Sequence, residues 1–509
     1  MHRYLYLISA LLLVILWSSC RKDFEYTPSA GNLEFSKDTV YLDTIFTNIG
    51  SSTYTLKVYN PNRDDIEIPT LGLKQGQNSK YRLNVDGVAG KEFVNIPILA
   101  QDSLFIFIET TYDVSNNAEN EFLYTDVIEF DSGVKLQEVP LVTLVKDAVF
   151  LYPSTLSDGT KETISLGLDL NGEEIRVEGF FLQEADLEFN NGKPYVIYGY
   201  AAVKQGDTLN IEAGCRVHFH KGSGIYISDG ASLNVNGALS LDQELLENEV
   251  IFEGDRLEPE FLDIPGQWGG IWLSEGSSNN TISHLIIKNA TTGLLVAGDG
   301  ILQSPTLSIG NAQIYNSAYT NLWSKNSHII AENVILGGAG HVSLHLNLGG
   351  IYSFTHATIA NYWTHGFRTG SALQIDNYDA VRSGNLIQAD FKNCIVDGNS
   401  ALELSLRVND INSFNFSFDH SLIKFQEAVG QSNDNPLYDF SDNTYYNQVI
   451  LNQYLDFNDV TRNIYWIGET SAARDIAKLE VALLVPSDIF GTDRTVLPDI
   501  GAFEFIAEN

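Results

Sequence analysis

The sequence has few of the residues on which disulfide-rich, cysteine-metal and nucleic-acid-binding proteins depend. Its 509 residues include three cysteines, one methionine and only 30 lysines and arginines, against 65 aspartates and glutamates. Because phosphate binding needs a basic surface, the formal net charge of −35 argues against a nucleic-acid partner. No CxxC spacing is present, so Cys215 and Cys394 are interpreted as small buried apolar side chains, with a metal or redox site as the weaker alternative.

Helical and nucleotide-binding patterns are also missing. No long segment after residue 20 shows helical periodicity with caps, whereas 41 glycines favour a turn-rich β-protein. The sequence contains no P-loop, GxGxxG fingerprint, nucleophile elbow or HExxH helix. Composition therefore predicts an all-β protein, in which a hydrophobic content of 44% suffices for large cores.

Residues 1–20 have the pattern of a targeting segment. Two polar residues precede an apolar run from Leu5 to Trp17, which is too short to span a bilayer comfortably. The letters LWSSC at its end resemble the lipobox of bacterial lipoproteins, although Trp17 stands where that family usually has leucine. The resemblance implies lipidation of Cys20, a short tether over 21–29 and anchorage in the outer membrane. In the tether, Arg21-Lys22-Asp23 with Glu25 resembles the charged segment that sends some lipoproteins to the cell surface, which implies that the protein faces the cell exterior. The alternative is an ordinary secretory signal that is simply removed.

Residues 30–147 alternate apolar and polar side chains in short runs separated by turn signals such as Asp86-Gly87. About seven such strands predict a β-sandwich. The stretch from Thr47 to Asn60 resembles the immunoglobulin-like modules that carry an "iGs…l.v.N" pattern, which implies a spacer or a contact surface.

Residues 148–193 form a polar connection rich in Asn-Gly and Asp-Gly turns, for which we expect hairpins or an N-terminal cap on the next domain. From Pro194 to about residue 425, short alternating strands are separated by glycines. Six short motifs then recur at intervals of 22 to 37 residues. Each begins with one of His284, Asn311, Asn333, His356, Asn393 and His420, and an aliphatic residue follows three positions later. A drifting period with Asn or Gly at corners predicts a stacked β-coil.

This segment, 194–425, resembles the right-handed parallel β-helix proteins of the pectate-lyase-like superfamily. The predicted fold class is therefore an all-β chain, with an N-terminal β-sandwich followed by a right-handed single-stranded parallel β-helix. Within 426–509, the ending Pro498-Asp499-Ile500-Gly501-Ala502-Phe503-Glu504 is similar to the "choice-of-anchor Q" ending of bacterial β-helix proteins. The similarity implies a terminal structure that closes the open end of the coil.

The column of His and Asn residues resembles a metal or catalytic array, but we interpret it as structural. Equivalent polar residues at a corner hydrogen-bond along the stack, and the alternation of His with Asn shows that imidazole chemistry is not required. A second ladder of the same kind is expected at Asn289, Asn316 and Asn361.

Aligning the strands that follow the corners brings a different set of residues onto one outward stripe. The glycan-binding candidates on or beside it are Trp272, Trp323, His345, Asp376, Glu403 and Arg407. Aromatic rings beside acid, amide and imidazole groups suit a sugar chain. The alternative is that both tryptophans pack under loops or under the N-terminal domain.

Catalysis in the same groove is a second hypothesis. A polysaccharide lyase needs a base and a cation for the uronate carboxylate, for which His345, Arg368, Arg382 or Arg407 are available with Asp376 or Asp379. A glycoside hydrolase would need two opposed carboxylates. The acidic run from Glu244 to Asp263 is interpreted as a solvated excursion, with Ca²⁺ binding as the alternative, so no metal or other cofactor is predicted.

Taken together, the sequence predicts a cell-surface lipoprotein that displays a β-helix for carbohydrate binding or surface interaction. A polysaccharide lyase or glycoside hydrolase and a structural or adhesive stalk remain the alternatives. The expected partners are the membrane, through the lipid anchor, and a polysaccharide.

Overall fold

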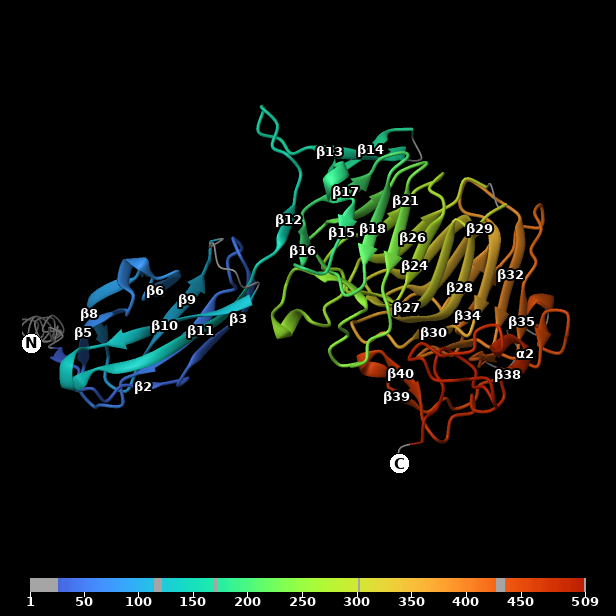
Figure 1. The fold of residues 1–509 in the computed structure, drawn as a ribbon. Helices are drawn as coiled ribbons and strands as arrows, with labels where there is room; N and C mark the ends of the chain where they lie inside the picture. The colour runs from blue at the N-terminus through green and yellow to red at the C-terminus, as the bar shows by residue number, and fades with distance from the viewer. Residues whose placement is uncertain (1–25, 114–120, 169–171, 301–302, 427–434, 508–509) are drawn as a thin grey trace, which may run out of the picture. The chain divides into compact units, whose positions relative to one another are not determined.

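A computed structural model describes residues 26–113, 121–168, 172–300, 303–426 and 435–507 (Figure 1). The chain divides into two compact units, residues 1–147 and 148–509. Nearly all regular structure in the described residues is β, and their single α-helix is α2 (Leu479–Ala482). Within these residues, no helix has the length and apolar character of a transmembrane span.

The first unit is a sandwich of two sheets. One sheet has the order β1-β5-β10-β11-β3 with β8 on β5, and the other has the order β2-β4-β9-β6-β7. Their bounds are β1 (Thr27–Pro28), β2 (Glu34–Phe35), β3 (Val40–Phe46), β4 (Tyr54–Tyr59), β5 (Ile66–Leu73), β6 (Tyr81–Val85), β7 (Val88–Gly90), β8 (Glu92–Ile98), β9 (Ser103–Thr110), β10 (Glu121–Phe130) and β11 (Gln137–Lys146). Period-2 alternation turns one face of each sheet inward, so Leu56 and Ile106 from one sheet share a core with Ile68 and Ile128 from the other.

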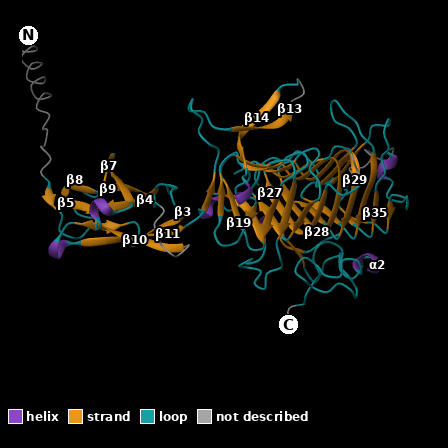
Figure 2. Cartoon of the chain, turned by 45° about the horizontal axis from the view of Figure 1, so that its top comes forward, coloured by secondary structure: helices purple, strands orange, loops and turns teal. Residues whose placement is uncertain are grey.

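The second unit is a right-handed parallel β-helix, whose successive coils pair in register through three ladders (Figure 2). Ladder 1 contains β14 (Glu174–Phe181), β17 (Tyr200–Val203), β20 (Gly224–Ile227), β23 (Gly270–Leu273), β26 (Thr292–Ala297), residues 320–325 of β28 (Thr320–Ala339), residues 342–347 of β29 (Val342–Thr355), β31 (Leu373–Asp376) and β34 (Leu404–Arg407). The fold class predicted from the sequence is confirmed.

The other two ladders complete each coil. Ladder 2 contains β15 (Glu188–Phe189), β18 (Thr208–Glu212), β21 (Ser232–Asn236), β24 (Asn280–Ser283), residues 307–310 of β27 (Leu307–Ser317), 327–332 of β28, 350–355 of β29, β32 (Leu386–Lys392), β35 (Ser417–Asp419) and β37 (Tyr446–Asn447). Ladder 3 contains β12 (Val149–Leu151), β16 (Tyr195–Ile197), β19 (Arg216–Phe219), β22 (Val250–Gly254), β25 (Leu285–Lys288), residues 312–317 of β27, 334–339 of β28, β30 (Thr358–Asn361), β33 (Ile395–Gly398), β36 (Leu422–Ile423) and β38 (Ile450–Leu451).

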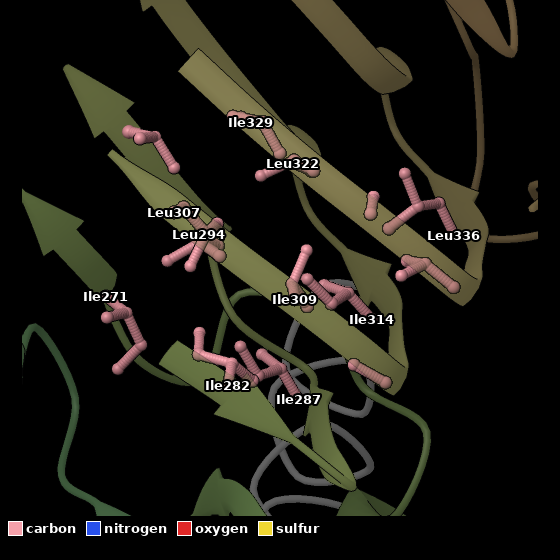
Figure 3. Close-up of a cluster of buried hydrophobic side chains, with 14 of the residues drawn as sticks. Ile271, Ile282, Ile287, Leu294, Leu307, Ile309, Ile314, Leu322, Ile329 and Leu336 are labelled. Atoms are coloured by element: carbon pink, nitrogen blue, oxygen red, sulfur yellow. The ribbon is translucent and has the colours of Figure 1, made fainter. Parts of the chain in front are cut away.

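Aliphatic rows fill the inside of the coil. Ile287, Ile314, Leu336 and Ile359 occupy successive positions on ladder 3 and are fully buried. Figure 3 shows three of them together with rows from the other two ladders, such as Ile271, Leu294 and Leu322, whose side chains meet in one core. Because every coil adds the same apolar set, the core is continuous along the stack.

The predicted corner column turns the chain between ladders 2 and 3. All six residues, His284, Asn311, Asn333, His356, Asn393 and His420, have a positive φ between 48° and 54°. Asn is the residue besides Gly that adopts this conformation most readily. The expected bonding along the stack is confirmed in two pairs: Asn333 donates to the Asn311 amide oxygen at 2.9 Å, and Asn393 lies 3.0 Å from His356 Nε2. In the second predicted column of corner residues, Asn316 donates to the Asn289 amide oxygen at 2.6 Å.

The coil begins before the boundary at residue 194. Strand β12 pairs with β16, and β14 with β17, both in parallel, so the segment 148–193 supplies the first coil. It also carries an antiparallel hairpin of β13 (Thr163–Leu168) with β14, as its turn residues suggested. These early strands are too short to show a repeat in the sequence.

The chain after the last coil, residues 452–507 (the C-terminal segment), packs on the flank of the coil, so its anchor-like ending does not lie over the open end as expected. Ile489, Ala502 and Phe503 pack on Ile335 and Ala360 of ladder 3, on the flank of the coil. Strands β39 (Phe457–Asp459) and β40 (Ile464–Ile467) belong to this segment. The end of the core is instead covered by aromatic rings from the last described coil, among which Tyr438 stacks on Phe425 at 4.8 Å.

Candidate functional site

A single row of side chains follows the outer face of ladder 1. Parallel register aligns Tyr226, Trp272, Leu295, Trp323, His345, Gln374 and Ser405 from coil to coil. We call this row the ladder-1 stripe. Its members are mostly aromatic or polar, whereas nearly all their inward neighbours along the strands are aliphatic. The alignment of Trp272, Trp323 and His345 predicted from the sequence is confirmed.

Both tryptophans of the stripe are partly buried against neighbouring groups. The Trp272 ring meets Tyr226 edge-on, with centroids 5.7 Å apart. The Trp323 ring lies parallel to the His345 imidazole at 5.7 Å, and the Lys325 ammonium lies 4.1 Å from its centroid. Trp323 is therefore stacked on a neighbouring coil, whereas Trp272 meets its neighbour edge to face.

A second outward row runs two residues further along each strand. It aligns Lys325, Asn347, Asp376 and Arg407. Asp376 is buried and accepts hydrogen bonds from three side chains: His345 Nε2 at 2.8 Å, Gln374 Nε2 at 2.9 Å and the Asn347 amide. Its carboxylate thus holds the imidazole and two amides in fixed orientations and is itself turned away from solvent.

Three polar atoms of the stripe have no hydrogen-bond partner within the described residues. They are the indole Nε1 of Trp272, the indole Nε1 of Trp323 and Nδ1 of His345, and all three are buried. Leaving a buried donor unpaired costs about 1–3 kcal/mol, so native structures usually provide a partner. All three lie on one row: Trp323 is two coils beyond Trp272, and His345 is one coil further.

Glu403 does not belong to the stripe. The register places Ser405 opposite Gln374, two residues later than the alignment predicted, and Glu403 is fully buried at the corner before the strand. There it accepts from Arg368 at 2.7 Å and from the backbone N–H groups of Ala372 and Ser400. Burial raises the pKa of the Glu403 carboxyl, and Arg368 opposes that shift. Its role is to hold the loop, not to contact a ligand.

Basic groups border the stripe around Trp323 and His345. Arg407 is exposed, and Arg382 pairs loosely with Asp379 and Glu275 at 3.5 and 3.6 Å. Burial lowers the pKa of the Lys325 ammonium, and the positive charge of Arg382 lowers it further. The cations are partly compensated, so the face carries a mixed charge instead of a strong field of one sign.

An aromatic rim that the sequence analysis missed flanks the stripe. Tyr319 is 42% exposed, stacks on His341 at 4.9 Å and lies 5.9 Å from Trp323. His341 also bonds to Thr369 at 2.9 Å, in the same loop as Phe367, which is 92% exposed. Because these residues precede the strands at a corner, period-2 alternation did not identify them. The exposed aromatic residues in turns were the available signal.

The remaining sequence candidates lie apart from this row. In the acidic run, Glu249 accepts from Ser240 and Glu253 pairs with Lys288 at 2.6 Å. Among the described residues, no group of three His, Cys, Asp or Glu side chains is placed to hold a metal ion. Cys215 and Cys394 are buried and unpaired with each other. Cys20 lies outside the described residues.

Comparison with known proteins yields no close relative. No family model matches the chain, and no curated protein matches it. Two solved structures, both of the catalytic domain of a GH87 alpha-1,3-glucanase, cover 74% of this chain and 82% of their own at 10% identity. One is in complex with tetrasaccharides and has a TM-score of 0.16; the other is in complex with nigerose and has a TM-score of 0.14. Similarity at this level assigns neither a family nor a site.

Proposed function

We propose that the ladder-1 stripe binds a polysaccharide chain that runs along the coil axis. The observation that carries the proposal is the alignment of Trp272, Trp323 and His345 on one outward row, beside the exposed ring of Tyr319. These residues are three coils apart from first to last, or about 14 Å at the strand spacing of a sheet. Sugar hydroxyls supply both donors and acceptors at such intervals, and the aromatic rim offers ring surface beside them.

Substitution of the tryptophans tests this function. Trp323→Ala and Trp272→Ala each remove one unpaired donor and its ring, and we expect at least tenfold weaker retention on the polysaccharide that the wild-type chain binds best. Trp466→Ala is the matched control, because Trp466 is 46% exposed in the C-terminal segment, outside the stripe. Unchanged retention of every polysaccharide by the double variant Trp272→Ala/Trp323→Ala would contradict the proposal.

A lyase activity in the same place is the second candidate. It is favoured by one arrangement: Asp376 fixes Nε2 of His345 while Nδ1 has no partner. In an elimination, Nδ1 would take the proton at C5 of a uronate, the electron pair would form the C4–C5 double bond, and the C4–O bond would break as the leaving oxygen takes a proton from water. The hydroxide left behind would then accept the proton from the His345 imidazolium. Lys325, one coil from His345, and Arg407, two coils from it, are the cations of the second row that could receive the carboxylate. Formation of unsaturated uronate products by wild type, lost in His345→Ala, is the required result.

We further propose that Cys20 carries a lipid and anchors the protein in the outer membrane, with the β-helix displayed outside the cell. The apolar run before the LWSSC motif supports this, and the sandwich, immunoglobulin-like in its sequence pattern, would then act as a spacer. Incorporation of a labelled fatty acid by wild type, but not by Cys20→Ala, tests the anchor. Protease treatment of intact cells tests the exposure: full protection would contradict it.

A further inference from the structure

A second groove lies on another side of the β-helix, between ladder 3 and the C-terminal segment. Tyr362, Asp397 and Lys424 line it on the coil side, and residues 452–457 with Val460 line the opposite side. Its volume is about 440 Å³, within the range of small-molecule sites. None of these residues belongs to the ladder-1 stripe.

The polar floor of this groove contrasts with the adjacent rows of ladder 3. Two residues before each floor position stand Ala360, Ile395 and Leu422, which are buried and pack against the C-terminal segment. An apolar floor would have extended that packing. Polar residues instead appear where the C-terminal segment leaves the coil face open, so packing does not account for them.

Hydrogen bonds hold the floor in a fixed arrangement. Asp397 is buried, accepts from the Tyr362 hydroxyl at 2.7 Å and from the Gly398 N–H at 2.8 Å, and lies 3.8 Å from the Lys424 ammonium. Lys424 also donates to the Gly398 carbonyl, which leaves it further donor capacity toward the groove. A carboxylate, a phenol and an ammonium group are therefore presented together on a rigid sheet.

The rim of the groove adds aromatic surface and amides. Tyr454 is 69% exposed, Phe457 lies beside it, and the side chains of Gln426 and Gln453 are exposed. The groove is lined by two carboxylates, Asp397 and Asp456, and one ammonium, Lys424, so the local charge disfavours an anionic ligand. Amides and rings above a fixed donor and acceptor pair match a neutral ligand rich in hydroxyl groups.

We propose that this groove is a second carbohydrate site, which takes a short neutral saccharide independently of the ladder-1 stripe. A volume of about 440 Å³ accommodates a small number of sugar units rather than a long chain. The site thus provides a contact to a chain end or a side branch, whereas the stripe contacts a chain along its length.

Titration of the full chain with neutral oligosaccharides of two to four sugars tests the proposal. We expect binding that Lys424→Met and Tyr454→Ala each weaken at least tenfold and that Trp323→Ala leaves unchanged. Tyr152→Ala is the matched control, because Tyr152 is 63% exposed and lies outside the groove. If Lys424→Met lowers the melting temperature, Tyr454→Ala, whose ring is at the surface, still decides the question.

The outcomes separate the two sites. The second site would be overturned if no neutral oligosaccharide bound at millimolar concentration, or if binding survived in the double variant Lys424→Met/Tyr454→Ala. Neither result would bear on the proposed function of the stripe. Binding abolished by Trp323→Ala alone would also overturn it, because the oligosaccharide would then occupy the stripe. Loss of polysaccharide retention only in the stripe variants would support the stripe without affecting this groove.

Discussion

The imidazole of His345 and the carboxylate of Asp376 lie on adjacent coils, with Nε2 and Oδ2 2.8 Å apart. The pair is buried, and the same carboxylate also orients Gln374 and Asn347. The Asp376 carboxylate therefore organises the stripe, and its loss should affect every group that it holds.

We predict that Asp376→Ala weakens polysaccharide retention at least tenfold and lowers the free energy of unfolding by about 1–3 kcal/mol, because it strands three buried donors. Asp376→Asn, which keeps the shape and one acceptor, should lie between this variant and wild type. Urea unfolding and affinity electrophoresis measure the two effects. Asp410→Ala, an exposed aspartate after β34, is the control. Full retention in Asp376→Ala would show that the cluster does not shape the binding face.

Removal of Glu403 should damage stability without a specific effect on binding. Glu403→Ala leaves Arg368 as a buried guanidinium without its carboxylate, at a cost of about 3–5 kcal/mol. We expect a lower melting temperature but unchanged polysaccharide affinity measured well below it. A variant with normal stability and lost affinity would return Glu403 to the list of ligand contacts.

The corner column can be dissected at Asn333. Asn333→Ala loses the bonds to Asn311 and to the Ser487 carbonyl and places alanine at a φ of 51°. Asn333→Gly loses the same bonds without the backbone strain, so it should be more stable than the alanine variant by about 1–2 kcal/mol. Equal stability of the two variants, measured by chemical unfolding, would mean that the left-handed conformation is relaxed on substitution.

The buried acid Glu504 predicts a pH effect on the C-terminal segment. Burial and the neighbouring Asp499 raise its pKa from an ordinary value of 4.5 to about 8, although Arg494 lies 3.4 Å away. The folded chain therefore keeps a proton that the unfolded chain releases. The resulting stability is complete below pH 4.5 and is lost as the pH rises toward 8, by at most about 1.4 kcal/mol per pH unit.

In the Glu504→Gln variant the side chain cannot ionise, so this fall in stability with rising pH should be absent. The difference in unfolding free energy between wild type and Glu504→Gln, measured from pH 5 to pH 9, isolates the group from Asp499 and His356. Burial also raises the pKa of Asp499 and lowers that of His356, and both residues remain in each protein. Glu480→Gln, at an exposed position, is the control. A constant difference across the range would contradict the assignment.

The sequence predicted the coil because packing and backbone conformation place the same requirements on each repeated motif. Aliphatic residues such as Ile287 and Ile314 must face inward, and the six corner residues with a positive φ that the sequence pattern identified are all Asn or His. The outward positions of Trp272, Trp323 and His345 then follow from alternation alone. These features are local, and a single chain displays them directly.

Glu403 shows what the repeat could not decide. Leu402-Glu403-Leu404 and Leu404-Ser405-Leu406 have the same apolar-polar-apolar pattern, so a shift by two residues preserves every inward position. Only the loop that brings Arg368 to the carboxylate distinguishes them, and its path depends on tertiary contacts. The flank position of the C-terminal segment was missed for a similar reason, since an apolar ending suits either the end or the side of a coil.

The C-terminal segment bonds to three corners of the coil: Asn333 through the Ser487 carbonyl, Asn393 through the Lys478 carbonyl and His356 through the Gly501 carbonyl. These hydrogen bonds fix the number of coils between the three corners, because adding or deleting one coil would break at least one of the bonds. Among the described residues, no hydrogen bond to this segment is seen at the corner His284, although Gly491 lies close to Leu239. The three attachments therefore fix the spacing of the coils between Asn333 and Asn393 relative to the C-terminal segment.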